Sequence, residues 1–317
     1  MYLQPLTRPR RLTAGDRVVV VAPSGPMPKD RLDAGCEILR DWGLDVVVAS
    51  HVTDQHEKFD YLAGADEHRA ADLQEAWCDP SVAAVLCARG GYGAQRMMDL
   101  LDWSAMAAAE PKVFAGFSDI TALHEAFANC LGVATLHGPM VASTAFIDDV
   151  AGTAEHFRQT LFEPESVMTL TSPTAQTIAR GDPSMVSEDG TVSGVTIGGC
   201  ISMLAAELAT PTGRPNISGG ILLLEDVDED TYRLDRYITH MLRTGWLDGV
   251  AAVVLGSWHN CGALDEVVLD RFGDLGVPVV SELGFGHGEG TLTVPLGIPA
   301  TLDTKTSTLT LDTPALA

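Results

Sequence analysis

A serine stands where a predicted strand meets a predicted helix. Residues 113–117 predict a short buried strand, and the apolar spacing over 120–127 predicts a helix. On such a turn the Ser118 hydroxyl is exposed beside the first free N–H groups of the helix, which can stabilise an oxyanion. Gly116 leaves room for the turn. The pattern predicts a nucleophile, although a helix N-cap is an alternative and the second glycine of the elbow motif is absent.

An activated serine needs a general base, and three histidines are candidates. His124 lies about a turn and a half down the predicted helix, so its side chain is expected to point away from the serine. His137 ends a predicted strand, and His287 lies in a loop with alternating glycines, residues 284–290. The residues themselves leave His137 and His287 equally open, and either could simply be hydrogen-bonded to backbone.

The acidic run 225–230 contains the candidates for a carboxylate that orients the base. Glu225 directly ends an apolar strand predicted over 220–224, where a charge is costly without a partner. The acids at 226–230 precede a predicted helix and resemble capping and dipole partners. Glu225 is therefore the candidate, against the alternative that the whole run is a solvated loop.

The elements that must position these residues alternate in the first half of the chain. Apolar strands alternating with amphipathic helices predict an α/β fold, with a parallel sheet covered by helices on both faces. Functional loops then gather at the carboxyl ends of the strands, where residues 88–93 (Ala-Arg-Gly-Gly-Tyr-Gly) and 137–139 follow two of them. The glycine loop matches neither nucleotide-binding motif, so its glycines are expected to bring backbone N–H groups to a reacting centre. The strands are predicted at 17–22, 45–50, 83–88, 113–117 and 134–137, and the helices at 31–42, 68–78 and 95–101.

After about residue 150 the pattern changes. A connecting helix is predicted at 155–162, and short strands and turns over 169–194, with a hairpin turn at 188–191. We therefore expect an N-terminal α/β domain, residues 1–150, and a smaller, β-rich C-terminal domain, residues 166–317. Further helices are predicted at 201–208 and 231–242, strands at 220–224, 250–255 and 277–280, and β-type alternation over 291–311.

Composition excludes several classes of protein. A net charge of −23 disfavours nucleic acid and anionic lipid as partners. An apolar content of 46% with no run of about 20 apolar residues predicts a globular protein without a membrane span. Asp16 and Arg17 interrupt the apolar stretch near the start, which disfavours a secretory signal. The six scattered cysteines predict buried free thiols in a reducing compartment, and no ligand pair has zinc-site spacing, so we expect neither metal nor cofactor.

In order and interval, the motifs resemble the LD-carboxypeptidase family, serine peptidases that include the microcin C self-immunity peptidases. Each motif is weak alone, but together they run through nearly the whole chain. They are residues 20–25 (Val-Val-Ala-Pro-Ser-Gly), 88–93, 116–119 (Gly-Phe-Ser-Asp), 137–139 (His-Gly-Pro), 224–226 (Leu-Glu-Asp), 286–287 (Gly-His) and 295–297 (Pro-Leu-Gly).

This resemblance implies a catalytic triad of Ser118, His287 and Glu225, which decides between the two open histidines. It implies an oxyanion hole made by the N–H groups of Gly91 and Asp119. It further implies an N-terminal domain like a class I glutamine amidotransferase, a site at the junction of the two domains, and a homodimer. One departure is Cys200, which follows paired glycines where family members often have Asn.

The activity implied is removal of the terminal D-alanine from cytoplasmic murein tetrapeptides during wall recycling. Some cation must then meet the terminal carboxylate, and Arg89 is the candidate, unless it is a structural arginine bonded to nearby carbonyls. One alternative is an immunity peptidase that cleaves a peptidyl-nucleotide and needs an aromatic surface for the base; no aromatic cluster is evident near the motifs. The other is a non-catalytic binding module on the same fold.

Overall fold

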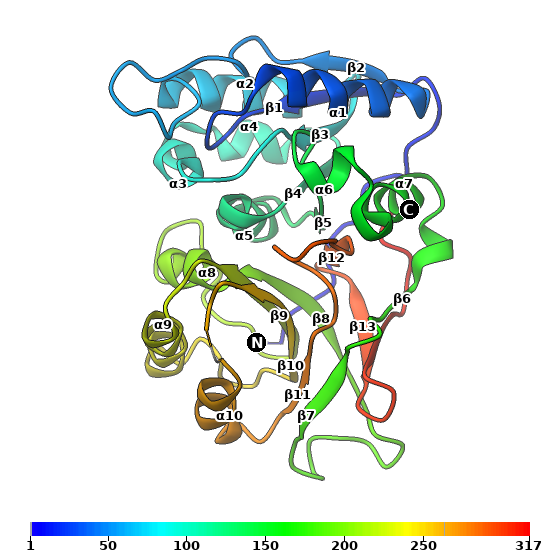
Figure 1. Cartoon of the computed structure of the whole chain (residues 1–317), viewed down its shortest axis with the longest axis vertical. Helices are drawn as coiled ribbons and strands as arrows, with labels where there is room; N and C mark the ends of the chain where they lie inside the picture. The colour runs from blue at the N-terminus through cyan, green and yellow to red at the C-terminus, as the bar shows by residue number, and fades with distance from the viewer. Residues whose placement is uncertain (1, 263) are drawn as a thin grey trace.

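Two β-sheets form the framework of the computed structural model, which describes residues 2–262 and 264–317 (Figure 1). The first sheet has the strand order β12-β5-β4-β3-β1-β2. Its five strands from the first half of the chain are parallel, as the alternation of strands and helices predicts. Their bounds are β1 Arg17–Val21, β2 Asp45–Val48, β3 Val82–Cys87, β4 Val113–Gly116 and β5 Thr135–His137.

Helices cover both faces of this sheet because its strands are apolar on both sides. In β1, Val18 and Val20 pack in the core with α1, α6 and α7, whereas Val19 and Val21 join the core with α2 and α5 on the opposite face. The helices of this half are α1 Lys29–Asp41, α2 Asp66–Cys78, α3 Ala94–Met97, α4 Trp103–Ala107, α5 Thr121–Ala126, α6 Thr144–Ile147 and α7 Thr153–Phe162.

The second sheet has eight strands in the order β6-β14-β13-β8-β9-β10-β11-β7. The four central strands β8 to β11 are parallel, and the outer ones are antiparallel. Helices α8 Ile201–Glu207, α9 Thr231–Arg243 and α10 Asp265–Gly273 pack on one face. The strands are β6 Thr169–Leu170, β7 Gln176–Arg180, β8 Thr191–Cys200, β9 Gly220–Val227, β10 Ala252–His259, β11 Pro278–Ser281, β13 Pro299–Asp303 and β14 Thr308–Leu311.

One strand from the second half of the chain belongs to the first sheet. Strand β12, Val294–Leu296, pairs antiparallel with β5 and lies between the two halves in Figure 1. The C-terminal residue also returns to the first half, where Ala317 exchanges backbone hydrogen bonds with Pro9 and Arg11. The division into residues 1–150 and 166–317 stays a prediction, and the structure adds that the two segments share a sheet.

Several sequence expectations need correction. The predicted hairpin at 188–191 forms a turn, but β7 pairs with β11 and β8 pairs with β13 and β9, so the flanking strands do not pair. The helix predicted over 95–101 is α3 followed by a 3₁₀ turn, Met98–Leu100. Helices α4, α6 and α10 were not predicted; α4 and α6 are too short to show a periodic apolar pattern.

Among the described residues, none of the helices combines the length and apolar character needed to cross a membrane.

Candidate active site

Ser118 lies at the end of β4 in a conformation that is rare for a residue with a side chain. Its φ is 65°, in the left-handed region, at the start of the 3₁₀ turn Ser118–Ile120 that leads into α5. Left-handed backbone costs a non-glycine residue about 1–2 kcal/mol, and such strain concentrates at functional sites. Phe117 occupies the N-cap position, and no side-chain capping bond is formed there. The N-cap alternative for Ser118 is therefore wrong.

The glycine loop after β3 abuts this serine. A Cβ at Gly90 would lie 2.9 Å from Ser118 Cβ and 3.3 Å from its Oγ, so only glycine allows the approach. The carbonyl of Gly90 accepts a hydrogen bond from the N–H of Gly25, at 2.9 Å. Gly91 has φ +105°, which also favours glycine. The close approach puts the backbone of the loop beside the Ser118 turn.

Asp119 is held rigidly behind the turn. Its Oδ2 accepts a 2.5 Å hydrogen bond from the Ser24 hydroxyl and a 2.8 Å bond from the backbone N–H of Ala94. Burial raises the pKa of the Asp119 carboxyl, against the opposing effect of these hydrogen bonds. The side chain thus ties the turn to the two neighbouring strand-end loops, and sequence reasoning did not find Ser24 in this role.

Glu225 lies within β9, not at its end as predicted, because the strand continues to Val227. Alternation along β9 puts Leu222 and Leu224 in the core with α8–α10, so Glu225 points to the opposite face with Leu223. The loop carrying His287 lies on that face. A Cβ at Gly286 would be 2.6 Å from Glu225 Oε2, so glycine at this position admits the carboxylate.

Glu225 and His287 form a buried pair. His287 Nδ1 lies 2.6 Å from Glu225 Oε2, and the Glu225 side chain is fully buried. Because Nδ1 faces the carboxylate, Nε2 is the ring nitrogen left for proton transfer. The imidazole lies against Phe117, with ring centroids 4.7 Å apart. The pair, which the second half of the chain supplies, therefore contacts Phe117, the residue before Ser118 in the first half.

Each partner of the pair shifts the pKa of the other. Burial alone would raise the pKa of Glu225, but attraction to His287 and contacts with both neighbouring imidazoles lower it to about 2. Burial would likewise lower the pKa of His287, but the Glu225 charge and hydrogen bond outweigh it and raise that pKa. The carboxylate stays ionised and makes the imidazole a stronger base.

The other two histidines are buried near the pair. His137 Nε2 lies 3.4 Å from Glu225 Oε1, so two imidazoles flank one carboxylate. His124 Nε2 lies 2.9 Å from the Gly116 carbonyl oxygen, and burial lowers its pKa to about 3. His124 is thus a neutral residue whose side chain is bonded to the backbone of β4.

Side chains from both halves meet around the serine turn. Thr121, at the start of α5, accepts a 3.0 Å hydrogen bond from the N–H of Cys200, and a Cβ at Gly199 would lie 2.5 Å from the Thr121 hydroxyl. The buried pair Arg214–Glu125 adds a second connection, with 2.5 Å between Nη2 and Oε1. Cys200, where this chain departs from the family pattern, is thus bonded through its backbone N–H to the first residue of α5.

Asp226, the first acid after Glu225, serves a different helix from the one expected. Asp226 Oδ2 accepts the N–H of Ser202, in the first turn of α8, at 2.9 Å. The capping role predicted in α9 for Asp226 is therefore wrong, because β9 ends beside the N-terminus of α8.

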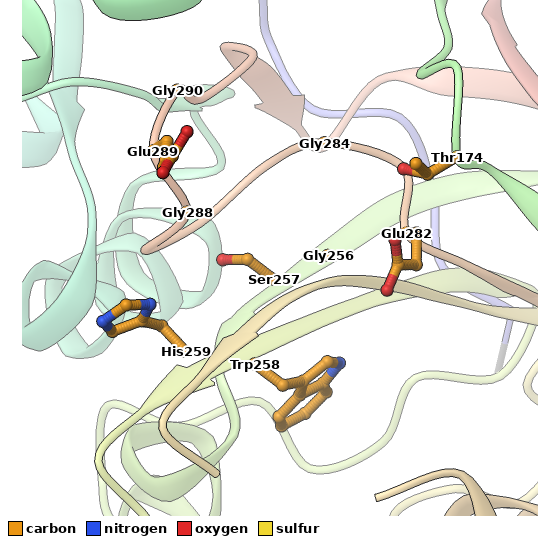
Figure 2. Close-up of a pocket in the computed structure, with 10 residues that line it drawn as sticks. All are labelled: Thr174, Gly256, Ser257, Trp258, His259, Glu282, Gly284, Gly288, Glu289 and Gly290. Carbon is orange, nitrogen blue, oxygen red and sulfur yellow. The ribbon is translucent and has the colours of Figure 1, made fainter. Parts of the chain in front are cut away.

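A cavity of about 500 Å³ is lined by residues 288–290, which directly follow His287 in the chain (Figure 2). Glycines at 288 and 290 form one wall with Glu289, and the end of β10 forms the other. In Figure 2, Ser257, His259 and Glu289 lie around the same space, whereas Trp258 points away from the glycine loop. Its exposed carboxylates, Glu282 and Glu289, make the cavity suited to a positively charged group.

Arg89 is exposed at the start of the glycine loop. Its guanidinium donates a hydrogen bond to the carbonyl oxygen of Pro26. It also lines a cavity of about 350 Å³ together with Arg31 and Ser143. Arg89 thus makes one bond to a nearby carbonyl, as its structural role requires, and it shares the cavity with a second arginine.

An aromatic row beside the glycine loop contradicts the expectation that the motifs lack an aromatic cluster. The ring centroids of Phe59 and Tyr61 are 5.5 Å apart, and those of Tyr61 and Tyr92 are 5.8 Å apart. Tyr61 and Tyr92 are 48% and 47% exposed. The sequence could not show the row, because residues 59–61 reach Tyr92 only through the fold.

The two-sheet α/β fold and a histidine–carboxylate pair beside a strained serine define a hydrolase of the serine peptidase class. Residues 18–138 match the LD-carboxypeptidase N-terminal domain, and residues 193–302 match the LD-carboxypeptidase C-terminal domain. The chain belongs to this family of peptidases.

Relatives of known sequence extend over almost the whole chain. A putative carboxypeptidase of Streptomyces coelicolor is 61% identical over 99% of both chains. The murein tetrapeptide carboxypeptidase of Pseudomonas aeruginosa is 32% identical over 90% of this chain and 93% of its own. The family resemblance stated from the motifs is thereby confirmed, and the protein is an enzyme, a serine-type carboxypeptidase.

Solved structures share the fold. The muramoyltetrapeptide carboxypeptidase of Oxalobacter formigenes superimposes with a TM-score of 0.74 at 29% identity, over 93% of this chain and 97% of that one. The microcin C7 self-immunity protein gives a TM-score of 0.83 at 21% identity, over 98% and 100% of the two chains. At that identity, the second likeness shows the fold alone.

Proposed function

We propose that this enzyme hydrolyses the amide before the terminal D-alanine of murein tetrapeptides, with Ser118, His287 and Glu225 as its triad. The observation that carries the proposal is the buried Glu225–His287 pair, whose imidazole lies against Phe117, next to Ser118. The relatives named for murein tetrapeptides support the substrate.

The reaction runs through an acyl-enzyme. Ser118 Oγ attacks the amide carbonyl carbon while His287 Nε2 takes the hydroxyl proton, and Glu225 stabilises the imidazolium. His287 then gives the proton to the departing amine of D-alanine as the C–N bond breaks. Water, deprotonated by His287, attacks the ester and releases the shortened peptide together with the free serine.

The oxyanion of each tetrahedral intermediate is assigned to the N–H groups of Gly91 and Asp119. Two features support this assignment: the glycine loop approaches Ser118 closely, and Asp119 is fixed by Ser24 and Ala94. Donors held in place before the reaction stabilise developing charge without reorganising during it.

The terminal carboxylate of the substrate is assigned to Arg89. Its exposed guanidinium lines a cavity with Arg31, and its planar fork matches a carboxylate with two parallel hydrogen bonds. The bond to Pro26 would hold the arginine in place while its other N–H groups meet the peptide.

The finer features of the enzyme belong to the same proposal. They are an amidotransferase-like N-terminal domain over residues 1–150, a C-terminal domain over 166–317, a homodimer and a cytoplasmic location. Support for the reducing compartment comes from the six cysteines, all of which are free thiols. Sedimentation analysis tests the dimer directly.

Cleavage of peptidyl-nucleotides is a second candidate, favoured by the aromatic row. Tyr61 and Tyr92 have exposed rings next to the glycine loop, and Phe59 stacks on Tyr61. A base stacks on an exposed aromatic ring with about 1–3 kcal/mol.

Mass spectrometry of product mixtures tests both candidates. Untagged enzyme is incubated separately with murein tetrapeptide, murein pentapeptide and a peptidyl-adenylate amide. We expect tripeptide and free D-alanine from the tetrapeptide, and no product with Ser118→Ala. An intact tetrapeptide alongside a cleaved adenylate would replace the first candidate by the second.

A further inference from the structure

Three side chains outside the active site converge between β2 and α2. His51 follows β2, Asp54 lies three residues further on, and His68 is in the first turn of α2. One potential ligand atom from each lies within 4.8 Å of the other two. The close approach depends on Gly64, where φ is +85° and a Cβ would be 2.7 Å from Asp54 Cβ.

A fourth residue, Asp72, fixes the orientation of His51. Its Oδ1 lies 2.8 Å from His51 Nδ1, and its Oδ2 accepts the backbone N–H of His51 at 2.9 Å. The Asp72 side chain is only 6% exposed. Because Nδ1 donates to the carboxylate, Nε2 carries the free lone pair in the neutral ring. Histidine ligands of metal ions are held in this way by a carboxylate behind them.

The charges around the cluster favour a cation. The Asp54 carboxylate lies beside the two imidazoles, and the Asp72 carboxylate is hydrogen-bonded to His51. The imidazoles of His51 and His68 are stacked, with centroids 4.1 Å apart, so two protonated rings there would repel each other. One shared cation balances the carboxylates without that repulsion.

We propose that His51, Asp54 and His68 bind a divalent transition-metal ion, with Zn²⁺ the best match. Two imidazoles and one carboxylate are a ligand set that Zn²⁺ accepts, and water completes a tetrahedral shell. The adjoining hollow of about 480 Å³, lined by Asp54 and His68, leaves room for that water. Sequence spacing missed this site because its two histidines are seventeen positions apart.

The role of this ion is structural. In the first sheet, β2 is the edge strand and β4, which leads to Ser118, is three places away. The ion would hold together both ends of the segment 51–68. That segment carries Phe59 and Tyr61 of the aromatic row, and Ala63 donates its N–H to the Ser24 carbonyl. Metal binding therefore orders one wall of the active-site entrance without taking part in the chemistry.

Metal titration of the untagged, EDTA-stripped protein tests the site. Zn²⁺ is added in competition with a chromophoric chelator, and Co²⁺ absorption reports the geometry. We expect one equivalent of Zn²⁺ per chain, a tetrahedral Co²⁺ spectrum and a higher melting temperature. Asp72→Asn should weaken binding by about 10- to 100-fold, the usual effect of losing a carboxylate behind a ligand.

Two further variants make the test decisive. His68→Gln changes a side chain that is 52% exposed, so it should fold normally and lose the tight equivalent. His240→Gln changes an exposed histidine on α9 and should bind like the parent protein. Absence of a tight equivalent in the parent, or its survival in folded His68→Gln, would overturn the proposal. Neither result bears on the triad, because no catalytic residue is altered.

Discussion

The molecule contains two histidine–carboxylate pairs that are nearly the same in geometry. His287 Nδ1 lies 2.6 Å from Glu225, and His51 Nδ1 lies 2.8 Å from Asp72. In both, the carboxylate is buried and the imidazole is more exposed, at 17% for His287 and 33% for His51. Both therefore leave Nε2 as the nitrogen available for chemistry.

The difference lies in what the free nitrogen can meet. The His287 ring lies against Phe117, beside a strained serine and a glycine loop. The His51 ring stacks on His68 near Asp54, so its neighbours are potential metal ligands. One device thus suits a general base in the first setting and a metal ligand in the second, so the pair alone does not define function.

The largest expected effect is the loss of kcat when side chains of the catalytic triad are removed, which should not follow removal of His51. Ser118→Ala and His287→Ala should each lower kcat by about 10⁴- to 10⁶-fold, and the double variant should lose no more, because triad members act as a unit. His51→Ala should keep its turnover. Steady-state assays on tetrapeptide, with circular dichroism to verify folding, measure this. Near-normal turnover by Ser118→Ala would assign the nucleophile elsewhere.

The carboxylates give the next largest contrast. Glu225→Gln should lower kcat by about 10⁴-fold, because an amide stabilises the wrong tautomer of the base and cannot balance the imidazolium. Asp72→Asn makes the same chemical change behind His51 and should leave kcat unaltered. Equal losses in the two variants would mean that both act only through stability.

The pH profile sharpens the contrast further. His287 acts as a base when neutral, so kcat/KM should rise with pH through its pKa, which lies above the ordinary value for histidine. Glu225→Gln removes the charge that stabilises the imidazolium, so the acidic limb of the residual activity should move to lower pH. Asp72→Asn should leave the limb in place. A limb that stays put in Glu225→Gln would show that His287 is not the titrating base.

A smaller effect is expected at the substrate carboxylate. Arg89→Lys should raise KM about tenfold for peptides with a free C-terminus, the equivalent of about 1.4 kcal/mol, because an ammonium cannot form the bidentate bond. For C-terminally amidated peptides, KM should be the same for the parent enzyme and for Arg89→Lys. Matching losses on the two substrates would confine Arg89 to its bond with the Pro26 carbonyl.

The smallest effect on catalysis is expected from metal removal. EDTA should leave kcat on tetrapeptide unchanged, because the triad requires no metal, while lowering the melting temperature of Zn²⁺-loaded protein. Assays and thermal melts of the same sample check both halves. Activity lost on chelation and restored by Zn²⁺ would place a metal in the chemistry.

The sequence predicted the elements that are strongly periodic and the residues that belong to ordered motifs. The parallel strands and the long helices of the first half follow from apolar alternation. The pairing of Glu225 with His287 was expected only through family resemblance, since 62 positions separate them. Spacing cannot show which strand ends meet across two sheets.

The failures have a common physical cause. The aromatic row, the approach of His137 to Glu225 and the His51 cluster all join residues brought together by tertiary packing. Short strands were expected over residues 169–194, but their pairing was not, because a turn signal specifies a local reversal and not the neighbouring strand.

Strand β12 has a consequence for how the protein is made. It covers the edge of β5, yet its residues leave the ribosome more than 150 positions later. At about 5–20 residues per second, that edge stays unpaired for about 10–30 s during synthesis. Open strand edges recruit other chains, so the nascent protein passes through an aggregation-prone interval. The interval ends when β12 has been synthesised and pairs with β5. A fragment limited to residues 1–150 would keep the edge of β5 open.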